Sequence, residues 1–364
     1  MNKRWFIGLW LALALVSGCR KPDGAVLPDD GTPVPIVVDF NSLDLVQTRS
    51  RGPLEGWNGE DIYLYAVERR ERAAGEAENA LFLFEQQDSH MSKFQPLKVQ
   101  APTESGTSNV QVTKSSGEHF YYKPNTQLDF YAYSVDDAVL GSPALSADGS
   151  LRVTLSISGR QDILMAKADP KEDCADKLSP EEAYGPLSAR RDIHPHLRFR
   201  HKLSRFVFRL QSNDPDKKKF TLERLSVYSK TQAQMLVVHP RHEVTAPEVF
   251  SPLDGSEGWL SLTGQNLPKV DDPASTADVL VMPGASEYAV EMLVRQDNAV
   301  EPYEMSIKVD LSQCIHKENG AYTAEPGYQY KILLTLNGRE KVDVQVTLEE
   351  WKDGGSAAID PDAD

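Results

Sequence analysis

The chain has 364 residues, which is enough length for two domains of ordinary size. Charged residues make up 26% of the sequence and hydrophobic residues 40%, as in a folded soluble protein, and the Gly and Pro contents exclude a collagen-like or low-complexity chain. The formal net charge of −15 argues against binding nucleic acid or an anionic membrane through charge, because both require a cationic face.

The N-terminus predicts export and lipidation. After a short basic start, residues 5–16 form an apolar stretch. It is shorter than the ~20 residues that a membrane-spanning helix needs, and it suits the hydrophobic region of a secretory signal. Residues 15–19 (L-V-S-G-C) resemble a bacterial lipobox, in which small residues admit a peptidase and the cysteine thiol takes the lipid. We expect lipidation of Cys19 and membrane contact only through that lipid; the alternative is ordinary secretion with an incidental cysteine.

Strand patterns dominate the rest of the chain. Residues 61–67 (D-I-Y-L-Y-A-V) and 342–348 (V-D-V-Q-V-T-L) alternate along two faces, as half-buried strands do. The strand candidates in chain order are 34–46, 61–67, 80–85, 119–122, 128–135, 151–157, 162–166, 199–211, 220–229, 259–262, 277–282, 288–295, 303–309, 328–336 and 342–348. Helical signals are few: residues 69–79 are charged without an apolar stripe, and residues 179–182 (S-P-E-E) begin a short helix with proline at its first position.

These elements predict an all-β fold of two transthyretin-like or Greek-key β-sandwich domains in tandem, with few short helices. The expected organisation is a lipoprotein signal peptide over 1–18, a tether over 19–33, an N-terminal sandwich over 34–193, a C-terminal sandwich over 194–352 and an acidic tail over 353–364.

No catalytic, cofactor or metal site is predicted, and no enzymatic activity. The sequence lacks G-x-S-x-G, P-loop and G-x-G-x-x-G motifs. The histidines at 194, 196, 201, 239 and 242 could suggest a metal site, but we favour solvated loop histidines because proline and arginine interrupt both groups. Residues 169–176 have carboxylates but not the alternating ligands of a calcium loop, so a solvated acidic loop is expected. The pairing of Cys174 with Cys314 is left open.

Aromatic residues on the early strands could form either a sandwich core or a platform for sugars. Tyr63 and Tyr65 alternate on one strand candidate, and Phe130, Tyr131 and Tyr133 lie on another. We favour core packing and cross-strand pairs.

Several segments in chain order resemble the fimbrillin family, the subunits of lipoprotein-derived (type V) pili. The segments that carry the resemblance are residues 59–66 (G-E-D-I-Y-L-Y-A), 121–124 (Y-Y-K-P), 128–133 (L-D-F-Y-A-Y), 161–166 (Q-D-I-L-M-A), 199–206 (F-R-H-K-L-S-R-F), 326–330 (P-G-Y-Q-Y) and the strand that ends at Trp351. The resemblance spans residues 37 to 352.

The resemblance implies a mechanism of assembly. Such precursors reach the outer membrane as lipoproteins, and an arginine-specific protease then removes the first strand together with the lipid. A strand from another subunit fills the groove that is left open. Here the excisable strand is 34–46, and the cut falls after Arg49 or Arg51. Its apolar residues are Val37, Val38, Phe40, Leu43 and Leu45. The alternative for residues 48–52 is a plain loop with two arginines.

The C-terminus departs from the pattern of shaft subunits, which continue into an apolar donor strand. Residues 360–364 (D-P-D-A-D) make a poor buried strand. The prediction is therefore a tip or minor subunit that serves adhesion, located at the outer membrane and then in the fimbrium, with other pilus subunits as partners and an unknown host or bacterial surface ligand. The alternatives are a surface glycan-binding lipoprotein that feeds a polysaccharide uptake system and, third, an exported hydrolase.

Overall fold

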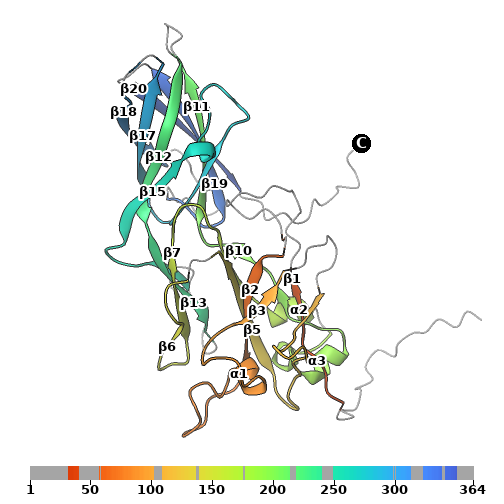
Figure 1. Cartoon of the computed structure of the whole chain (residues 1–364). Helices are drawn as coiled ribbons and strands as arrows, with labels where there is room; N and C mark the ends of the chain where they lie inside the picture. The colour runs from red at the N-terminus through yellow and green to blue at the C-terminus, as the bar shows by residue number, and fades with distance from the viewer. Residues whose placement is uncertain are drawn as a thin grey trace, which may run out of the picture. The chain divides into compact units, whose positions relative to one another are not determined.

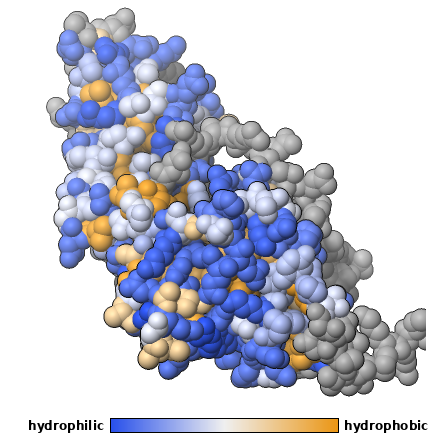
Figure 2. All heavy atoms as spheres, turned by 60° about the horizontal axis from the view of Figure 1, so that its bottom comes forward, coloured by the Kyte–Doolittle hydropathy of each residue, from blue (hydrophilic) through white to orange (hydrophobic). Residues whose placement is uncertain are grey.

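The computed structural model describes residues 32–40, 57, 59–101, 109–136, 139–174, 177–213, 219–239, 249–297, 299, 301–312, 323–337 and 341–350. About half of these residues lie in β-strands and few lie in helices, so the predicted all-β sandwich class is confirmed (Figure 1). No helix in these ranges is long and apolar enough to cross a membrane. In the view of Figure 2, hydrophilic residues predominate and hydrophobic residues gather in small groups.

The elements are many strands, from two to eleven residues long, and a few helices of at most five residues. The strands are β1 (Val37–Phe40), β2 (Asp61–Glu68), β3 (Leu97–Gln100), β4 (Asn109–Gln111), β5 (Leu128–Val135), β6 (Ala144–Leu145), β7 (Leu151–Ser156), β8 (Ile163–Lys167), β9 (His196–Leu197), β10 (Arg200–His201), β11 (Ser204–Ser212), β12 (Phe220–Lys230), β13 (Gln232–Val238), β14 (Phe250–Pro252), β15 (Glu257–Thr263), β16 (Ala277–Val281), β17 (Glu287–Gln296), β18 (Tyr303–Asp310), β19 (Tyr328–Asn337) and β20 (Lys341–Glu350). The helices are α1 (Leu83–Gln87), α2 (Pro170–Cys174), α3 (Pro186–Arg190) and the 3₁₀ turns η1 (Pro180–Glu182) and η2 (Gly264–Asn266).

Three sheets build the part of the fold that holds β1. They are the central sheet β10-β8-β5-β2-β3, the sheet β4-β1-β9 and the sheet β14-β13-β7-β6. Alternate residues of β5 belong to different cores: Phe130 and Ala132 pack with β1, whereas Tyr131 and Tyr133 pack with β7 and β13. A strand buried on both faces reads as a continuous apolar run, which is why 128–135 is so apolar.

The two cores are defined by their members. The β1 core contains Ile36, Val38, Phe40, Trp57, Ile62, Leu64, Phe84, Val112, Phe120, Phe130, Leu164, Tyr184, Leu197 and Phe199 among others. The large core runs from Tyr65 and Tyr131 through Leu155 and Ile163 to Phe206, Val227, Leu260, Val279, Tyr288 and Tyr330.

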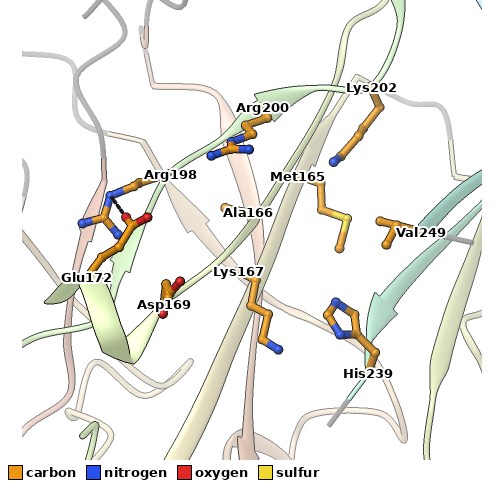
Figure 3. Close-up of a pocket in the computed structure, with 10 residues that line it drawn as sticks. All are labelled: Met165, Ala166, Lys167, Asp169, Glu172, Arg198, Arg200, Lys202, His239 and Val249. Carbon is orange, nitrogen blue, oxygen red and sulfur yellow. Dashed lines mark ion pairs between the residues drawn. The ribbon is translucent and has the colours of Figure 1, made fainter. Parts of the chain in front are cut away.

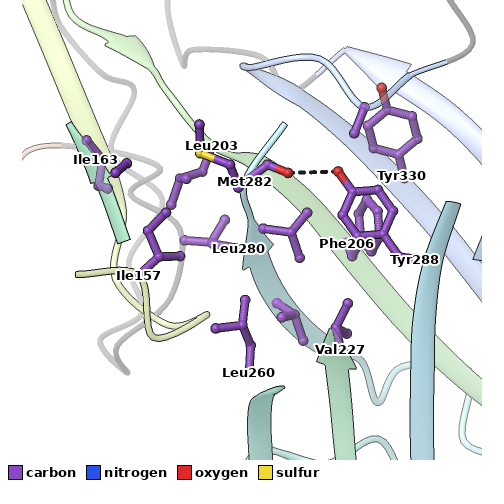
Figure 4. Packing of buried hydrophobic residues seen from close by; sticks show 14 of the residues in the cluster. Ile157, Ile163, Leu203, Phe206, Val227, Leu260, Leu280, Met282, Tyr288 and Tyr330 are labelled. Atoms are coloured by element: carbon purple, nitrogen blue, oxygen red, sulfur yellow. Dashed lines mark hydrogen bonds between the residues drawn. The ribbon is translucent and has the colours of Figure 1, made fainter. Parts of the chain in front are cut away.

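The remaining strands form a second pair of sheets, β16-β11-β19-β20 and β15-β12-β17-β18. Phe206 of β11 lies between them, with ring centroids 4.8 Å from Tyr288 and 5.5 Å from Tyr330. The Tyr288 hydroxyl donates to the Met282 carbonyl at 2.7 Å, so the buried phenol keeps a hydrogen-bond partner. Figure 4 shows Ile157 and Ile163 in the same cluster as Leu280 and Phe206.

Among the described strands, three sheets draw members from both sides of residue 194, where the sequence predicts a boundary. β13 follows that position and pairs antiparallel with β7, which precedes it. Residues 232–238 were not predicted as a strand. Backbone pairing and a shared core therefore connect the two halves, and the predicted domain limits stay predictions.

Most predicted strands are found, with one clear error. The predicted strand over 80–85 is wrong beyond Phe82, which makes a single bridge to Val67, because residues 83–87 form α1. Leu83 and Phe84 are buried in the β1 core, and a short apolar run fits a buried helix as well as a strand. Residues 119–122 form isolated bridges rather than a strand.

The tyrosines of the early strands are core residues and cross-strand pairs, as expected. Tyr63 and Tyr133 face each other in register and stack with ring centroids 5.0 Å apart. The short helix predicted from residue 179 is η1, with Ser179 at its N-cap and Pro180 at its first position.

We predict that Gly159→Ala lowers the free energy of unfolding by about 2–4 kcal/mol. Gly159 has a φ of +85°, and an added Cβ would lie 3.1 Å from Leu260 Cβ and 3.2 Å from Val279 Cγ1. Backbone strain of about 1–2 kcal/mol then adds to the cost of overpacking. Urea denaturation of the purified chain measures the loss.

Gly149→Ala is the matched control. Gly149 has the same φ of +85° but no atom within 4 Å of an added Cβ, so only the strain of about 1–2 kcal/mol is expected. Equal losses in the two variants would show that the packing around Gly159 carries no cost.

Candidate functional site

The candidate site is the position that the first strand occupies. β1 pairs antiparallel with β4, with Val38 opposite Val110, and parallel with β9, with Phe40 opposite Leu197. It is therefore the middle strand of a three-stranded sheet whose other two strands have only three and two residues. We call this position the seat of β1. It lies between residues 109–122 on one side and residues 195–197 on the other, and residues 34–40 fill it.

Backbone hydrogen bonds hold residues 34–40 on both edges. The Ile36 amide donates to the Phe120 carbonyl at 2.8 Å, and the Ile36 carbonyl accepts from the Val112 amide at 3.0 Å. On the other edge, the Asp39 amide donates to the Pro195 carbonyl at 2.9 Å. Removal of this segment would leave amides and carbonyls on both walls without partners, and such edges bind another strand readily.

Alternate side chains of the segment are completely buried. Ile36 and Val38 have no exposed surface and Phe40 has 1%, whereas Val37 and Asp39 are half-buried. Burial of each large apolar side chain stabilises by about 1.5–3 kcal/mol. The seat therefore has a period-two pattern of apolar pockets, which selects a strand with apolar residues at every second position.

Aromatic rings close the end of the seat around Phe40. Its ring centroid lies 6.1 Å from that of Phe199, and Phe199 in turn packs edge-on against Trp57 at 5.0 Å. Phe199 is the second residue after β9, so the wall that pairs with β1 also supplies its aromatic pocket.

A buried carboxylate anchors β9, the parallel wall. Asp173 of α2 accepts hydrogen bonds from the His196 amide at 2.8 Å, from Arg198 Nη2 at 2.8 Å and from the Tyr184 hydroxyl at 2.5 Å. The expected solvated acidic loop over 169–176 is thus wrong for Asp173, which is buried at the C-terminal end of a short helix.

Asp39 brings an ionisable group into the seat. Burial raises the pKa of Asp39, and the nearby His194 and His196 partly oppose the rise. Burial, together with the Arg198 charge, lowers the pKa of His196. Among the described residues, Asp39 Oδ1, His194 Nδ1 and His196 Nε2 are buried without a hydrogen-bond partner.

The structure places only some of the predicted site residues. Val37, Val38 and Phe40 lie in the seat, with Val38 and Phe40 buried. The predicted residues that lie outside the described ranges are Cys19, Leu43, Leu45, Arg49 and Arg51.

Sequence reasoning missed both walls of the seat. β4 and β9 are too short to show alternation, and residues 194–196 stand out in the sequence only for their two histidines. Their signal was the β-branched and apolar character of Val110, Val112 and Leu197, which is weak in segments of this length.

The histidines and cysteine are mostly structural. His201 and His239 are buried, so the expectation of solvated loop histidines is wrong for them; His201 Nδ1 lies 2.8 Å from Asp162. No cluster of three metal-binding side chains occurs within the described ranges. Cys174 is buried with a free thiol, and Cys314 lies outside the described residues.

Comparison with known proteins gives one family. A family model described as fimbrillin-like matches residues 50–351. Among solved structures, a suggested cell adhesion protein from Bacteroides uniformis has 16% identity over 90% of this chain and 100% of its own, with a TM-score of 0.49. A fimbrial protein from Bacteroides vulgatus has 11% identity over 88% and 100%, with a TM-score of 0.45. The fimbrial anchor protein Mfa2 from Porphyromonas gingivalis has 11% identity over 88% and 98%, with a TM-score of 0.37. No curated protein matches the chain.

We predict that Asp39→Asn stabilises the folded chain at pH 7. Because the folded-state pKa of Asp39 is raised, ionisation costs more in the folded than in the unfolded state. This cost is absent below the ordinary pKa of 3.8, grows as the pH rises through the folded-state pKa, and is constant above it. Urea denaturation at pH 7 and pH 4 should show an advantage of the variant that shrinks at the lower pH.

Asp254→Asn is the control, because Asp254 is exposed on a turn. A stabilising effect of Asp39→Asn that is equal at both pH values would contradict burial of an ionised Asp39.

Proposed function

The chain belongs to the fimbrillin-like family, and we propose that it is a pilus subunit whose first strand is cut off and replaced by a strand from a neighbouring subunit. The observation that carries this proposal is the position of residues 34–40. They bond through the backbone on both edges and bury alternate side chains, yet they precede residue 50, where the family match begins.

The seat has the features that strand exchange requires. A donor that enters between β4 and β9 would recover the backbone bonds of Phe120, Val112 and Pro195, and its alternate apolar residues would fill the pockets of Ile36, Val38 and Phe40. The strands β2, β5 and β8 pair with one another and not with β1, so their pairing does not depend on which strand fills the seat.

Proteolysis would convert a fixed strand into a replaceable one. While the chain is intact, the short connection to residue 57 keeps β1 at high effective concentration. After a cut at Arg49 or Arg51, β1 is held only by noncovalent contacts and can be displaced. The proposal includes an arginine-specific protease as a partner for this reason.

The other parts of the proposal rest on sequence. Lipidation of Cys19 would anchor the precursor in the outer membrane before it joins the fimbrium. The proposal also includes a place for the chain as a tip or minor subunit that accepts a strand and serves adhesion. We propose no catalytic activity and no cofactor.

We predict that limited digestion of the full chain, in mild detergent, by an arginine-specific protease gives a new N-terminus at Ser50 or Gly52. The body should keep its β-sheet circular dichroism spectrum. Mass spectrometry identifies the cut. The Arg49→Gln/Arg51→Gln double variant should resist cleavage there, and a first cut elsewhere in both proteins would contradict the proposal.

We further predict that the cut chain exchanges its strand. A labelled synthetic peptide of residues 34–46 should bind the cut chain and not the uncut chain, as measured by fluorescence anisotropy. The same peptide with Val38→Asp should bind at least ~100-fold more weakly, because a carboxylate would enter a fully buried pocket. Equal binding of the two peptides would show that the seat does not select for an apolar side chain at position 38.

One observation favours glycan binding as a second candidate function. Tyr228 and Trp259 are 42% and 41% exposed, face each other across β12 and β15, and have ring centroids 5.1 Å apart. Next to them, the Ser226 and Ser261 hydroxyls share a hydrogen bond of 2.8 Å. Exposed aromatic faces beside hydroxyl groups suit the apolar and polar faces of a sugar ring. A surface lipoprotein that feeds polysaccharide to an uptake system would use such a platform.

We predict that, if this second function holds, Trp259→Ala abolishes binding on a glycan array while leaving the unfolding midpoint almost unchanged, because the indole is exposed. Leu140→Ala, at a residue 41% exposed and distant in sequence, is the control. Absence of glycan binding by the unmodified chain would remove the second candidate.

A further inference from the structure

A cavity lies between the sheet that contains β8 and β10 and the ends of β13 and β14. Its volume is about 240 Å³, and Figure 3 shows its lining. The lining residues are Met165, Ala166, Lys167, Asp169, Glu172, Arg198, Arg200, Lys202, His239 and Val249. Of these residues only Ala166 also belongs to the β1 core.

The cations of the cavity come from one alternating segment. Residues 197–203 read L-R-F-R-H-K-L, and the structure buries Leu197, Phe199, His201 and Leu203 on one face. Strand geometry then directs Arg198, Arg200 and Lys202 to the other face, which is the cavity. Lys167 of β8 adds a fourth cation.

The carboxylates of the lining do not neutralise this charge. Glu172 binds Arg198 at 3.1 Å, at one side of the cavity (Figure 3), and Asp173 also binds Arg198. Asp169 accepts a hydrogen bond from the Lys171 amide at 2.9 Å. Within the described ranges, no carboxylate forms an ion pair with Lys167, Arg200 or Lys202. An excess of positive charge therefore faces the cavity of a chain whose net charge is −15.

The surroundings of Lys202 disfavour its charged form. Burial, and secondarily the Arg200 guanidinium, lowers the pKa of Lys202 to about 8. In Figure 3 its ammonium group is directed towards Met165 and the interior of the lining. A cation that is partly desolvated beside another cation is stabilised when an anion binds between them.

The opposite side of the cavity is apolar or aromatic. Met165 and Val249 line it, and His239 packs edge-on against Tyr131 with ring centroids 5.3 Å apart. A volume of about 240 Å³ exceeds the need of a single oxyanion and approaches the lower limit of ordinary ligand pockets. The ligand should therefore have an organic body as well as a negative charge.

We propose that this cavity binds an oxyanion, a carboxylate, phosphate or sulfate group, carried on an organic body of about monosaccharide size. Arg200 and Lys202 bind the oxyanion, Lys167 adds to the positive field, and the side formed by Met165, Val249 and His239 contacts the organic body. This site goes beyond strand exchange, because it uses neither the seat of β1 nor a cut at Arg49 or Arg51.

The proposal has a pH dependence with a defined sign. The groups that face Lys202 are Arg200 on its own segment, Lys167 and Asp169 from β8 and the residues after it, Glu172 and Arg198 at the far side, and His239 at the end of β13. A bound anion favours the ammonium form of Lys202. Affinity should thus be greatest below pH 8 and fall as the pH rises above 8, by up to tenfold for each unit.

The test is isothermal titration calorimetry of the full chain in mild detergent at low salt, with glucuronate, N-acetylneuraminate and glucose 6-phosphate as probes. Glucose is the neutral control and sulfate is the control without an organic body. We expect at least one probe to bind at least tenfold more tightly than sulfate at pH 7, no binding of glucose, and at least a tenfold loss of affinity at pH 9.5.

Variants locate the site. Arg200→Gln and Lys202→Met should each weaken binding of that probe at least tenfold, whereas Arg209→Gln, which removes an exposed cation of β11 outside the cavity, should not. Lys202→Met should also raise the unfolding midpoint without ligand, because it removes a poorly solvated charge. This second readout shows that the variant is folded.

Three results would overturn the proposal. They are the absence of binding by all three charged probes, equal affinities of Arg200→Gln, Lys202→Met and the unmodified chain, and binding of sulfate as tight as that of every organic probe, which would leave no role for an organic body.

Discussion

The double-edged backbone pairing of residues 34–40 is the constraint on which the functional interpretation depends. A strand that lies between two walls leaves polar backbone groups open on both sides when it is removed, and these groups must be paired again. β4 and β9 are too short to close the gap by pairing extensively with each other, and β9 is also fixed by the bond from its His196 amide to Asp173. The seat therefore requires a strand but does not dictate which molecule supplies it.

Most of the packing of the central sheet does not depend on β1. β5 is buried on both faces, and only one of its faces packs in the β1 core. On the other face, Tyr131 and Tyr133 pack in the large core with β7 and β13 and do not involve β1. The proposed exchange of one covering strand would thus affect one face of the sheet, while the pairing of β2, β5 and β8 and the packing of the second face would persist.

The segment 197–203 has two roles that follow from strand alternation. Its apolar face holds Phe199 against Phe40 and Leu203 in the large core. Its cationic face lines the cavity with Arg198, Arg200 and Lys202. A fold that needed only the apolar face would not require three alternating cations, and burial lowers the pKa of one of them, Lys202. The seat and the cavity thus share this segment but use different residues, which lie on its opposite faces.

The sequence by itself determined the longer strands and the all-β class, because alternation over seven residues, as in 61–67 and 342–348, specifies a strand wherever it packs. The family followed from motifs in chain order. The sequence also placed Val38 and Phe40 in a strand, which is β1 of the structure. Only the tertiary structure decided the walls of the seat, the pairing of β7 with β13 and the helical state of residues 83–87. These are short segments with little preference of their own, and their structure comes from partners distant in the chain. The same reason explains why the histidines at 201 and 239 proved buried and why three cations in sequence proved to share one cavity.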